Sequence, residues 1–470
     1  MTRPMSRSLQ ANNVSYGYPQ HGYGLPPISL DVSPGEAVHI AGPSGSGKST
    51  LARCLSGLIP HLYRGHLTGQ VRVDGLATCS TPLWQLAERA GLVFQNPAAQ
   101  LLTVRTVEEI VFGLENLGLP SAAIKQRTED ALRTFGLEAL RDRSPQTLSG
   151  GEQQKLVLAA ITARQPRVLI LDEPLSMLDS TAATRFVADL GNLARSGTTV
   201  VVCEHRAEFL QAIPGLRTVC LNGSAPPTLG SSMAAEASAF DVPPFELHAS
   251  GVGVALGGRP VLQDISLTAE GGQVVAIVGR NGVGKTTLLR ALAGLQGHRG
   301  EIRIDGQPPE LGMVFQNPDL QLFNATVRAE VLYRLEDPDI HRYEWLIEVL
   351  GLSRYEETPP LLLSEGEKKR LAVAITLMRA PRHGILLDEP SLGQDAGHKK
   401  TLMRLAHALA DAGQLVVLTT HDLTLAARAD RLLVMGESGF VADGPPHQVL
   451  RDKRAWDQVG LLIPDWMAIR

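Results

Sequence analysis

The 470-residue sequence predicts an α/β protein that is built from two similar domains in tandem. The first observation is a glycine-rich loop that follows an apolar run and occurs twice, at 42–50 and at 279–287. The second is a set of shorter motifs that follows each loop in the same order. The third is length, because each half is long enough to bury its own hydrophobic core.

Each loop has the form GxxxxGK[ST], in which the N–H groups of a tight turn point towards phosphate oxygens. The glycines let the backbone approach the phosphates, because no Cβ stands in between. The lysine reaches the β- and γ-phosphates, and the hydroxyl after it ligates Mg²⁺. The predicted nucleotide-binding residues are Gly42, Pro43, Ser44, Gly45, Ser46, Gly47, Lys48, Ser49 and Thr50, and in the second half Gly279, Arg280, Asn281, Gly282, Val283, Gly284, Lys285, Thr286 and Thr287.

The residues on either side of the loops predict a strand before each loop and a helix after it. The apolar runs 37–41 and 274–278 are typical of buried strands. The helix that follows would add its dipole to the phosphate site. Apolar residues at helical spacing predict that these helices include Leu51, Cys54, Leu55 and Leu58 in the first half, and Leu288, Ala291, Leu292 and Leu295 in the second.

Charge and hydropathy limit the partners that we expect. The formal net charge of −4 provides no general attraction to nucleic acid, so no nucleic-acid partner is expected. No stretch has the roughly 18 consecutive apolar residues of a membrane span, and the first residues lack the apolar core of a signal peptide. We therefore expect a soluble chain that reaches a membrane only by docking.

Acidic residues and a histidine follow buried strands in both halves. An apolar run ends at Asp172-Glu173, and another ends at Asp388-Glu389. The interval from Asp172 to His205 equals the interval from Asp388 to His421. A single histidine is more often a satisfied buried residue than a functional one, but equal spacing in two copies favours function.

The chemistry of these side chains suggests their roles. Aspartates at strand ends beside the phosphate loops suit Mg²⁺, and the adjacent glutamates are placed to polarise an attacking water. The histidines could contact the γ-phosphate, and the glutamines that follow short strands could sense Mg²⁺ and the water. The predicted catalytic residues are Glu173, His205, Glu389 and His421, and the predicted metal-site residues are Ser49, Gln95, Asp172, Thr286, Gln316 and Asp388.

With the segments Ser149-Gly150-Gly151 and Ser364-Glu365-Gly366, each half resembles the ATPase of ABC transporters, over nearly the whole chain. The resemblance implies two P-loop NTPase domains, each with a mainly parallel core sheet, an antiparallel β subdomain and a helical subdomain. It also implies ATP and Mg²⁺ as ligands and hydrolysis coupled to transport. We place the domains at 8–222 and 245–470, with a linker at 223–244 that is rich in Ala, Ser and Pro.

In this family the two domains pair head to tail, so each ATP lies between one domain's phosphate loop and the other's signature segment. If the two halves of this chain pair in the same way, Lys48 would share a site with Ser364-Glu365-Gly366, and Lys285 would share one with Ser149-Gly150-Gly151. The two sites would differ. Tyr18 stands at the position where members of the family have an aromatic residue that stacks on adenine, whereas Leu256 takes that position in the second half. Glu365 would repel the γ-phosphate unless it points away, and an outward glutamate at a helix N-terminus is the simpler interpretation.

Within the family, the segments Phe94–Leu101 and Phe315–Leu322 look like those of energy-coupling factor (ECF) ATPases. Such importers combine the ATPase with a transmembrane T component and an S component that captures a vitamin or a transition-metal ion such as cobalt or nickel. This implies a peripheral protein on the cytoplasmic face of the cell membrane. The alternatives are the ATPase of a sugar or peptide importer and a soluble ribosome-associated tandem ATPase. An unrelated P-loop NTPase is a further, weaker alternative.

Overall fold

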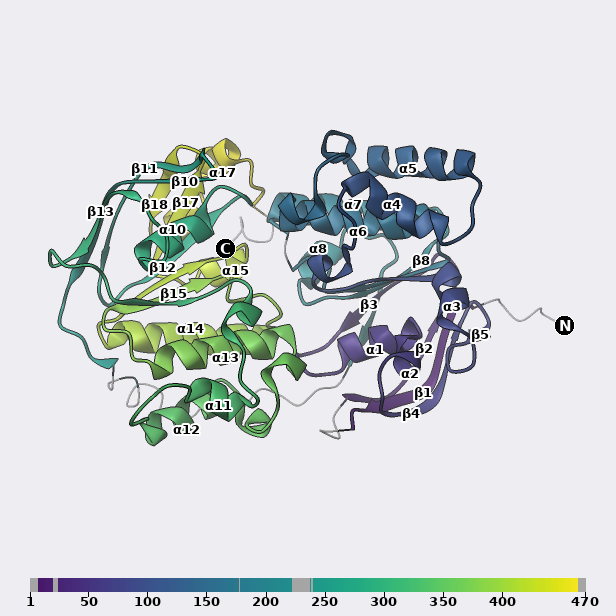
Figure 1. The fold of residues 1–470 in the computed structure, drawn as a ribbon, viewed down its shortest axis with the longest axis horizontal. Helices are drawn as coiled ribbons and strands as arrows, with labels where there is room; N and C mark the ends of the chain where they lie inside the picture. Colours follow the sequence, from purple (N-terminus) through teal and green to yellow (C-terminus); the bar gives the residue numbers. More distant parts are fainter. Residues whose placement is uncertain (1–6, 20–23, 177, 222–236, 238–239, 464–470) are drawn as a thin grey trace. The chain divides into compact units, whose positions relative to one another are not determined.

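The computed structural model describes residues 7–19, 24–176, 178–221, 237 and 240–463. The chain divides into two compact units, Met1–Ser224 and Ala225–Arg470. Purple, blue and dark teal colours mark the first unit in Figure 1, and lighter teal, green and yellow colours mark the second. Each unit combines a mainly parallel sheet, an antiparallel sheet and helices, which confirms the predicted fold class.

The first unit contains two sheets. The parallel sheet has the order β6-β7-β8-β3-β9, and its strands β7 and β8 are buried along their whole length, as expected for a parallel sheet that is covered on both faces. The antiparallel sheet has the order β2-β1-β4-β5. The strands are β1 Leu9–Gly17, β2 Gly24–Val32, β3 Ala37–Ala41, β4 His66–Val73, β5 Leu76–Ala77, β6 Ala90–Val93, β7 Val168–Asp172, β8 Thr199–Cys203 and β9 Arg217–Cys220.

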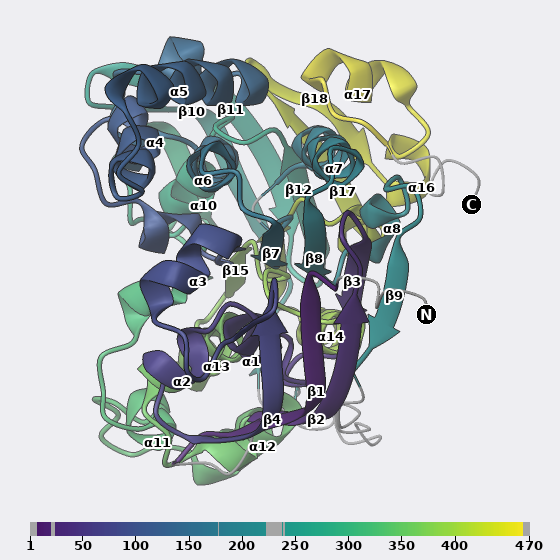
Figure 2. The ribbon, with the colours of Figure 1, turned by 90° about the vertical axis from the view of Figure 1, so that its right-hand side faces the viewer.

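The helices of the first unit fall into two groups. Figure 2 shows α1 close to the antiparallel sheet, and α4, α5 and α6 together in a separate helical layer. The helices are α1 Lys48–Leu55, α2 Leu58–His61, α3 Leu83–Arg89, α4 Thr106–Glu115, α5 Ser121–Phe135, α6 Gly150–Ala163, α7 Ser180–Arg195 and α8 Ala207–Leu210. The layer of α4, α5 and α6 is the helical subdomain that the resemblance implies.

The second unit has the same two kinds of sheet, with one strand more in its larger sheet and one strand fewer in its smaller sheet. Its larger sheet has the order β14-β15-β16-β12-β17-β18, and only β18 runs antiparallel to its neighbour. The smaller sheet has the order β11-β10-β13 and is antiparallel. The strands are β10 Glu246–Leu256, β11 Arg259–Glu270, β12 Val274–Gly279, β13 Arg299–Ile304, β14 Leu311–Val314, β15 Gly384–Asp388, β16 Leu415–Thr419, β17 Arg431–Gly436 and β18 Gly439–Gly444.

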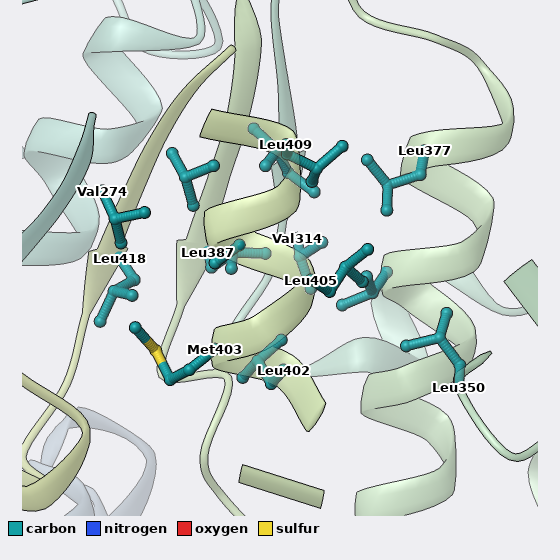
Figure 3. Packing of buried hydrophobic residues seen from close by; sticks show 14 of the residues in the cluster. Val274, Val314, Leu350, Leu377, Leu387, Leu402, Met403, Leu405, Leu409 and Leu418 are labelled. Atoms are coloured by element: carbon teal, nitrogen blue, oxygen red, sulfur yellow. The ribbon is translucent and has the colours of Figure 1, made fainter. Parts of the chain in front are cut away.

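Helices cover the larger sheet of the second unit and close its core. Figure 3 shows leucines of α14 between strand residues such as Leu387 and Leu377 of α13. Burial of this apolar surface is the main favourable term in folding. The helices are α10 Lys285–Leu292, α11 Val327–Val331, α12 Ile340–Val349, α13 Glu365–Met378, α14 Ala396–Asp411, α15 Leu423–Ala426, α16 Pro446–Val449 and α17 Lys453–Val459.

The helices after the phosphate loops are shorter than predicted. Gly57 (φ 80°) and Gly294 (φ 69°) follow the last turns of α1 and α10, and a left-handed glycine at this place ends a helix. Leu58 and Leu295 therefore lie beyond the helix ends, and Leu295 is 58% exposed. The prediction was wrong for these two residues, because apolar spacing continued past the glycines.

The end of the predicted linker packs on the second unit. Phe240 lies against Trp345, with 6.3 Å between ring centroids, and its carbonyl accepts a hydrogen bond from Gln414 Nε2 at 3.1 Å. The N–H of Val242 donates to the carbonyl of Ala412 at 3.0 Å. Residues 223–236 and 238–239 of the predicted linker lie outside the described residues.

Candidate nucleotide sites

The first phosphate loop joins β3 to α1. Lys48 is buried, and its Nζ donates hydrogen bonds to the carbonyls of Gly42 and Pro43 at 2.9 and 3.0 Å. The hydroxyl of Ser46 is buried and has no hydrogen-bond partner among the described residues, which fits a site that receives a polar ligand. The remaining predicted loop residues form the turn and the first helical turn, namely Ser44, Gly45, Gly47, Ser49 and Thr50.

The second loop, between β12 and α10, has the same geometry. Lys285 Nζ donates to the carbonyls of Gly279 and Arg280 at 2.7 and 3.0 Å. The glycine before each lysine has a positive φ, 95° at Gly47 and 106° at Gly284. A Cβ at Gly47 would lie 2.8 Å from the carbonyl oxygen of Gly24, so the backbone requires glycine there. The turn and helix start contain the other predicted residues, Asn281, Gly282, Val283, Thr286 and Thr287.

A carboxylate meets the loop hydroxyl in each unit. Ser49 Oγ donates to Asp172 Oδ1 at 3.0 Å, and Thr286 Oγ1 donates to Asp388 Oδ2 at 2.8 Å. Burial, and after it the neighbouring Glu173, raises the pKa of Asp172 to about 6. Hydroxyl and carboxylate oxygens are the ligands that Mg²⁺ prefers, so both pairs fit the predicted metal site.

Three predicted side chains of the first unit converge on one another. Gln95 Nε2 donates to Glu173 Oε2 at 2.8 Å. His205 Nε2 lies 3.3 Å from Glu173 Oε1. Glu173 itself has a φ of 47°, a left-handed conformation that is uncommon for residues other than glycine and occurs often at functional sites. The carboxylate of Glu173 thus lies between the amide and the imidazole.

The second unit brings together the glutamate and the histidine, but not the glutamine. Glu389 has a φ of 49°, accepts a hydrogen bond from the N–H of His421 at 3.2 Å, and lies 3.1 Å from His421 Nε2. Burial is the main cause that raises the pKa of Glu389 to about 7. Gln316 is exposed, and within the described ranges no hydrogen bond joins its side chain to Glu389. The two units therefore differ at the predicted metal-sensing glutamine.

The signature segments start two helices of equal length. Ser149 caps α6 and Ser364 caps α13, and each forms a capping box with the glutamate three residues later. Gly150 and Gly151 begin α6, and Glu365 and Gly366 begin α13. The N–H groups at such helix starts favour an anion.

Glu365 pairs with a lysine of its own helix. Its Oε1 lies 3.7 Å from Lys368 Nζ, and the same ammonium group is 2.8 Å from Asp319 Oδ1. Burial is the main cause that raises the pKa of Glu365. Lys368 thus provides the glutamate with a cationic partner one helical turn away, which suits a side chain that turns back along its helix.

The predicted adenine platform of the first unit has other contacts. The ring of Tyr18 packs edge-on against Tyr16, with 4.9 Å between centroids, and its hydroxyl accepts a hydrogen bond from Arg53 at 2.9 Å. Leu256, at the end of β10, is 44% exposed. Adenine stacking on Tyr18 stays a prediction.

Two residues near the second site were missed by the sequence analysis. Thr419 Oγ1 donates to Asp388 Oδ1 at 2.7 Å. Lys369, nearly fully buried, donates to the carbonyls of Phe315 and Asp388 at 3.1 and 3.2 Å, and burial lowers its pKa to about 8. Lys369 lies in the charged run 365–370 at the start of α13, so its residue type gave no signal that it is buried.

Two phosphate loops, each with a nearby Asp-Glu pair and a histidine, define a protein that binds and hydrolyses nucleoside triphosphates. The sequence pattern of the family described as ABC transporter matches residues 25–176 and 262–392. The chain belongs to this family, and it is an ATP-hydrolysing subunit of a transporter.

Known relatives agree with this assignment. A protein of Treponema denticola named as an ABC transporter ATP-binding protein is 35% identical, over 93% of this chain and 96% of its own length. A protein of Bacillus subtilis, YkoD, named as an HMP/thiamine import ATP-binding protein, is 33% identical, over 94% of this chain and 93% of its own length. The solved structure of an archaeal ribosome recycling factor, aABCE1, in complex with the stalk protein aP1 is 21% identical, with a TM-score of 0.58, over 95% of this chain and 92% of that chain. At this identity the last likeness shows the fold alone.

Proposed function

We propose that this chain powers an importer of the ECF type, for a vitamin or a transition-metal ion, by hydrolysing ATP at two sites. The proposal that the chain hydrolyses ATP at these sites rests on the positions of Gln95 and His205, which both contact the carboxylate of Glu173. The similarity to YkoD over nearly the whole chain supports an importer. The T component of the complex would bind this chain at the cytoplasmic face of the membrane, and an S component would capture the substrate.

In this proposal each residue has a definite task. Lys48 and Lys285 bind the β- and γ-phosphates of ATP, and the N–H groups of the loops bind the remaining oxygens. Glu173 and Glu389 accept hydrogen bonds from the attacking water, and His205 and His421 orient it against the γ-phosphate. Ser49 with Asp172, and Thr286 with Asp388, would hold Mg²⁺, which neutralises charge on the phosphates when it is bound.

We further propose that each signature segment completes the site of the other unit's phosphate loop. The helix starts at Ser149 and Ser364 support this, because the first N–H groups of a helix have no intrahelical partner and favour an anion. A matched pair of double variants tests it. Ser364→Arg with Lys48→Ala should disable one site and leave about one ATP analogue bound per chain, whereas Ser364→Arg with Lys285→Ala should leave none. Equilibrium dialysis with a non-hydrolysable analogue measures the stoichiometry, and the opposite pattern would contradict the pairing.

In the segments Phe94–Leu101 and Phe315–Leu322, which look like those of ECF ATPases, the last glutamine forms hydrogen bonds with the backbone. Gln100 accepts a hydrogen bond from the N–H of Phe94 at 2.7 Å and donates to the carbonyl of Leu92 at 2.9 Å. Gln321 makes the equivalent bonds to Phe315 and Met313, at 3.3 and 3.1 Å. The last glutamine of the segment therefore holds the chain that follows Gln95 or Gln316 against the preceding strand.

Each segment continues into exposed apolar side chains on a fixed backbone. Leu102 is 72% and Phe323 is 66% exposed. The buried carboxylate of Glu109 accepts hydrogen bonds from the N–H groups of Leu102 and Thr103, both at 2.9 Å. Glu330 does the same for Phe323 and its neighbour, at 2.8 and 2.6 Å. Exposed apolar side chains on a backbone that is fixed by hydrogen bonds are typical of protein interfaces, and we propose that the T component binds to them.

Among the described residues, no helix has the length and hydropathy of a membrane span.

The variant Leu102→Asp/Phe323→Asp is expected to lose the membrane partner while it keeps ATP binding. A charge in the buried centre of an interface lacks its water and a partner, so capture should fall at least about tenfold. The measurement is affinity capture from detergent-solubilised membranes of the source cells, with identification of the captured integral protein. Leu62→Asp is the matched control, because Leu62 is also exposed (66%) but lies outside these segments. Equal capture by all variants, or capture of ribosomes by the unaltered chain, would contradict the proposal.

A further inference from the structure

Glu204, the residue before His205, is buried and accepts three backbone hydrogen bonds. Its Oε1 accepts from the N–H groups of His205 and Arg206 at 2.7 and 3.0 Å. Its Oε2 accepts from the N–H of Leu175 at 3.0 Å. One carboxylate therefore joins the backbone that carries the imidazole to the segment that follows Glu173. Hydrogen bonds to a charged acceptor are roughly twice as strong as neutral ones.

Arg206 and His39 also contribute to this junction, by which we mean the place where the backbone of His205 meets the segment that follows Glu173. Arg206 donates to the carbonyls of Leu175 and Leu178, both at 2.8 Å. His39, in the strand that leads into the phosphate loop, lies with Nε2 3.0 Å from the carbonyl oxygen of Glu204. A carbonyl oxygen can only accept, so Nε2 of His39 carries the proton. The strand of the phosphate loop, the histidine and the segment after Glu173 thus meet at Glu204.

The second unit builds this junction without the carboxylate. Thr420 stands in the place of Glu204 and Ser391 in the place of Leu175, and their hydroxyl oxygens are 3.2 Å apart. The N–H of His421 donates to Glu389 rather than to the residue before it. The chain itself therefore contains a second pair of side chains that performs the same connection.

We infer that Glu204 is a positioning residue for hydrolysis at the first site. It fixes the backbone of His205, and through it the imidazole, relative to Glu173 and to the segment that contains Leu175. Among the described residues its carboxylate accepts hydrogen bonds from backbone N–H groups, so it would act through His205 rather than on the attacking water. This inference rests on the proposed function, in which Glu173 and His205 act on the attacking water.

The test replaces the junction of the first unit by that of the second. In a Glu389→Gln background, turnover reports the first site. Glu204→Thr should lower kcat roughly 10- to 100-fold, because small displacements of positioned groups have effects of this size, and it should leave the Kd for ATP within about twofold. Adding Leu175→Ser should restore kcat at least several-fold. Glu88→Thr, an exposed glutamate of α3, is the matched control and should match the background.

Hydrogen exchange supplies a readout that does not depend on turnover. Peptides that contain Leu175 and His205 should exchange faster in Glu204→Thr and slower again in the double variant. The inference is overturned if exchange and kcat stay at the level of the background, or if Leu175→Ser restores neither. If exchange behaves as expected while the Glu389→Gln background itself shows no turnover, the connection through Glu204 stands. The proposed role of the first site in hydrolysis then fails.

Discussion

Replacing Glu173 and Glu389 together by glutamine is expected to lower kcat for ATP hydrolysis by about 10²–10⁴-fold, while ATP binding persists. A glutamine keeps the shape of the side chain but cannot accept a proton from water, and general-base catalysis contributes rates of this size. Both glutamates lie within 3.3 Å of a histidine nitrogen, so we expect both units to hydrolyse ATP. Phosphate release at saturating ATP and Mg²⁺ measures kcat, and binding of a fluorescent ATP analogue checks affinity.

The single variants separate the two sites. We expect Glu173→Gln and Glu389→Gln each to reduce turnover without abolishing it, because each unit pairs a glutamate with a histidine. A variant with unchanged turnover would show that its glutamate serves a silent site. Glu88→Gln is the control for loss of a carboxylate at the surface of the first unit. Full turnover by the double variant would refute the assignment of both glutamates.

Local patterns predicted the parts of the fold that depend on local sequence. The strand predicted at 37–41 has the same bounds in the structure, because a continuous apolar run before a glycine turn leaves few alternatives. The loop, the lysine and the helix start follow from the demands of phosphate binding, and they recur in the second half. The helix ends were predicted less well, since Gly57 and Gly294 stop helices whose apolar spacing continues.

Contacts between distant residues could not be read from the sequence. Gln95 and Glu173 lie 78 positions apart, and nothing in the pattern indicated their hydrogen bond. Glu204 directly precedes His205, but its hydrogen bond from the N–H of Leu175, 29 positions earlier, cannot be read from the sequence. The same holds for Lys369, whose partners are carbonyl groups that every residue type provides. Side-chain hydrogen bonds of this kind depend on tertiary structure, and spacing alone does not fix them.

Lys48→Ala is expected to weaken ATP binding at the first site about 10- to 100-fold, and Lys285→Ala should do the same at the second. A hydrogen bond from a charged donor contributes about 1.5–3 kcal/mol, and each 1.4 kcal/mol is a factor of ten in Kd. In both units the ammonium group already points across the loop, where it donates to carbonyls 5 and 6 positions earlier in the chain. The cation is thus held at the loop before ATP arrives, so little order has to be gained on binding. Isothermal titration in the presence of Mg²⁺ measures both affinities.

The control for these variants must remove a cation without touching the loops. Lys125→Ala on α5 does so in the first unit, and its affinity for ATP should equal that of the unaltered chain. Thermal unfolding checks that loss of the buried Lys48 has not unfolded the unit, because the carbonyls of Gly42 and Pro43 lose their donor. If the folded double variant still binds two ATP molecules with unchanged affinity, the lysines do not contact phosphate. Binding of one ATP by each single variant, and of none by the double variant, would establish two separate sites that each depend on their own lysine.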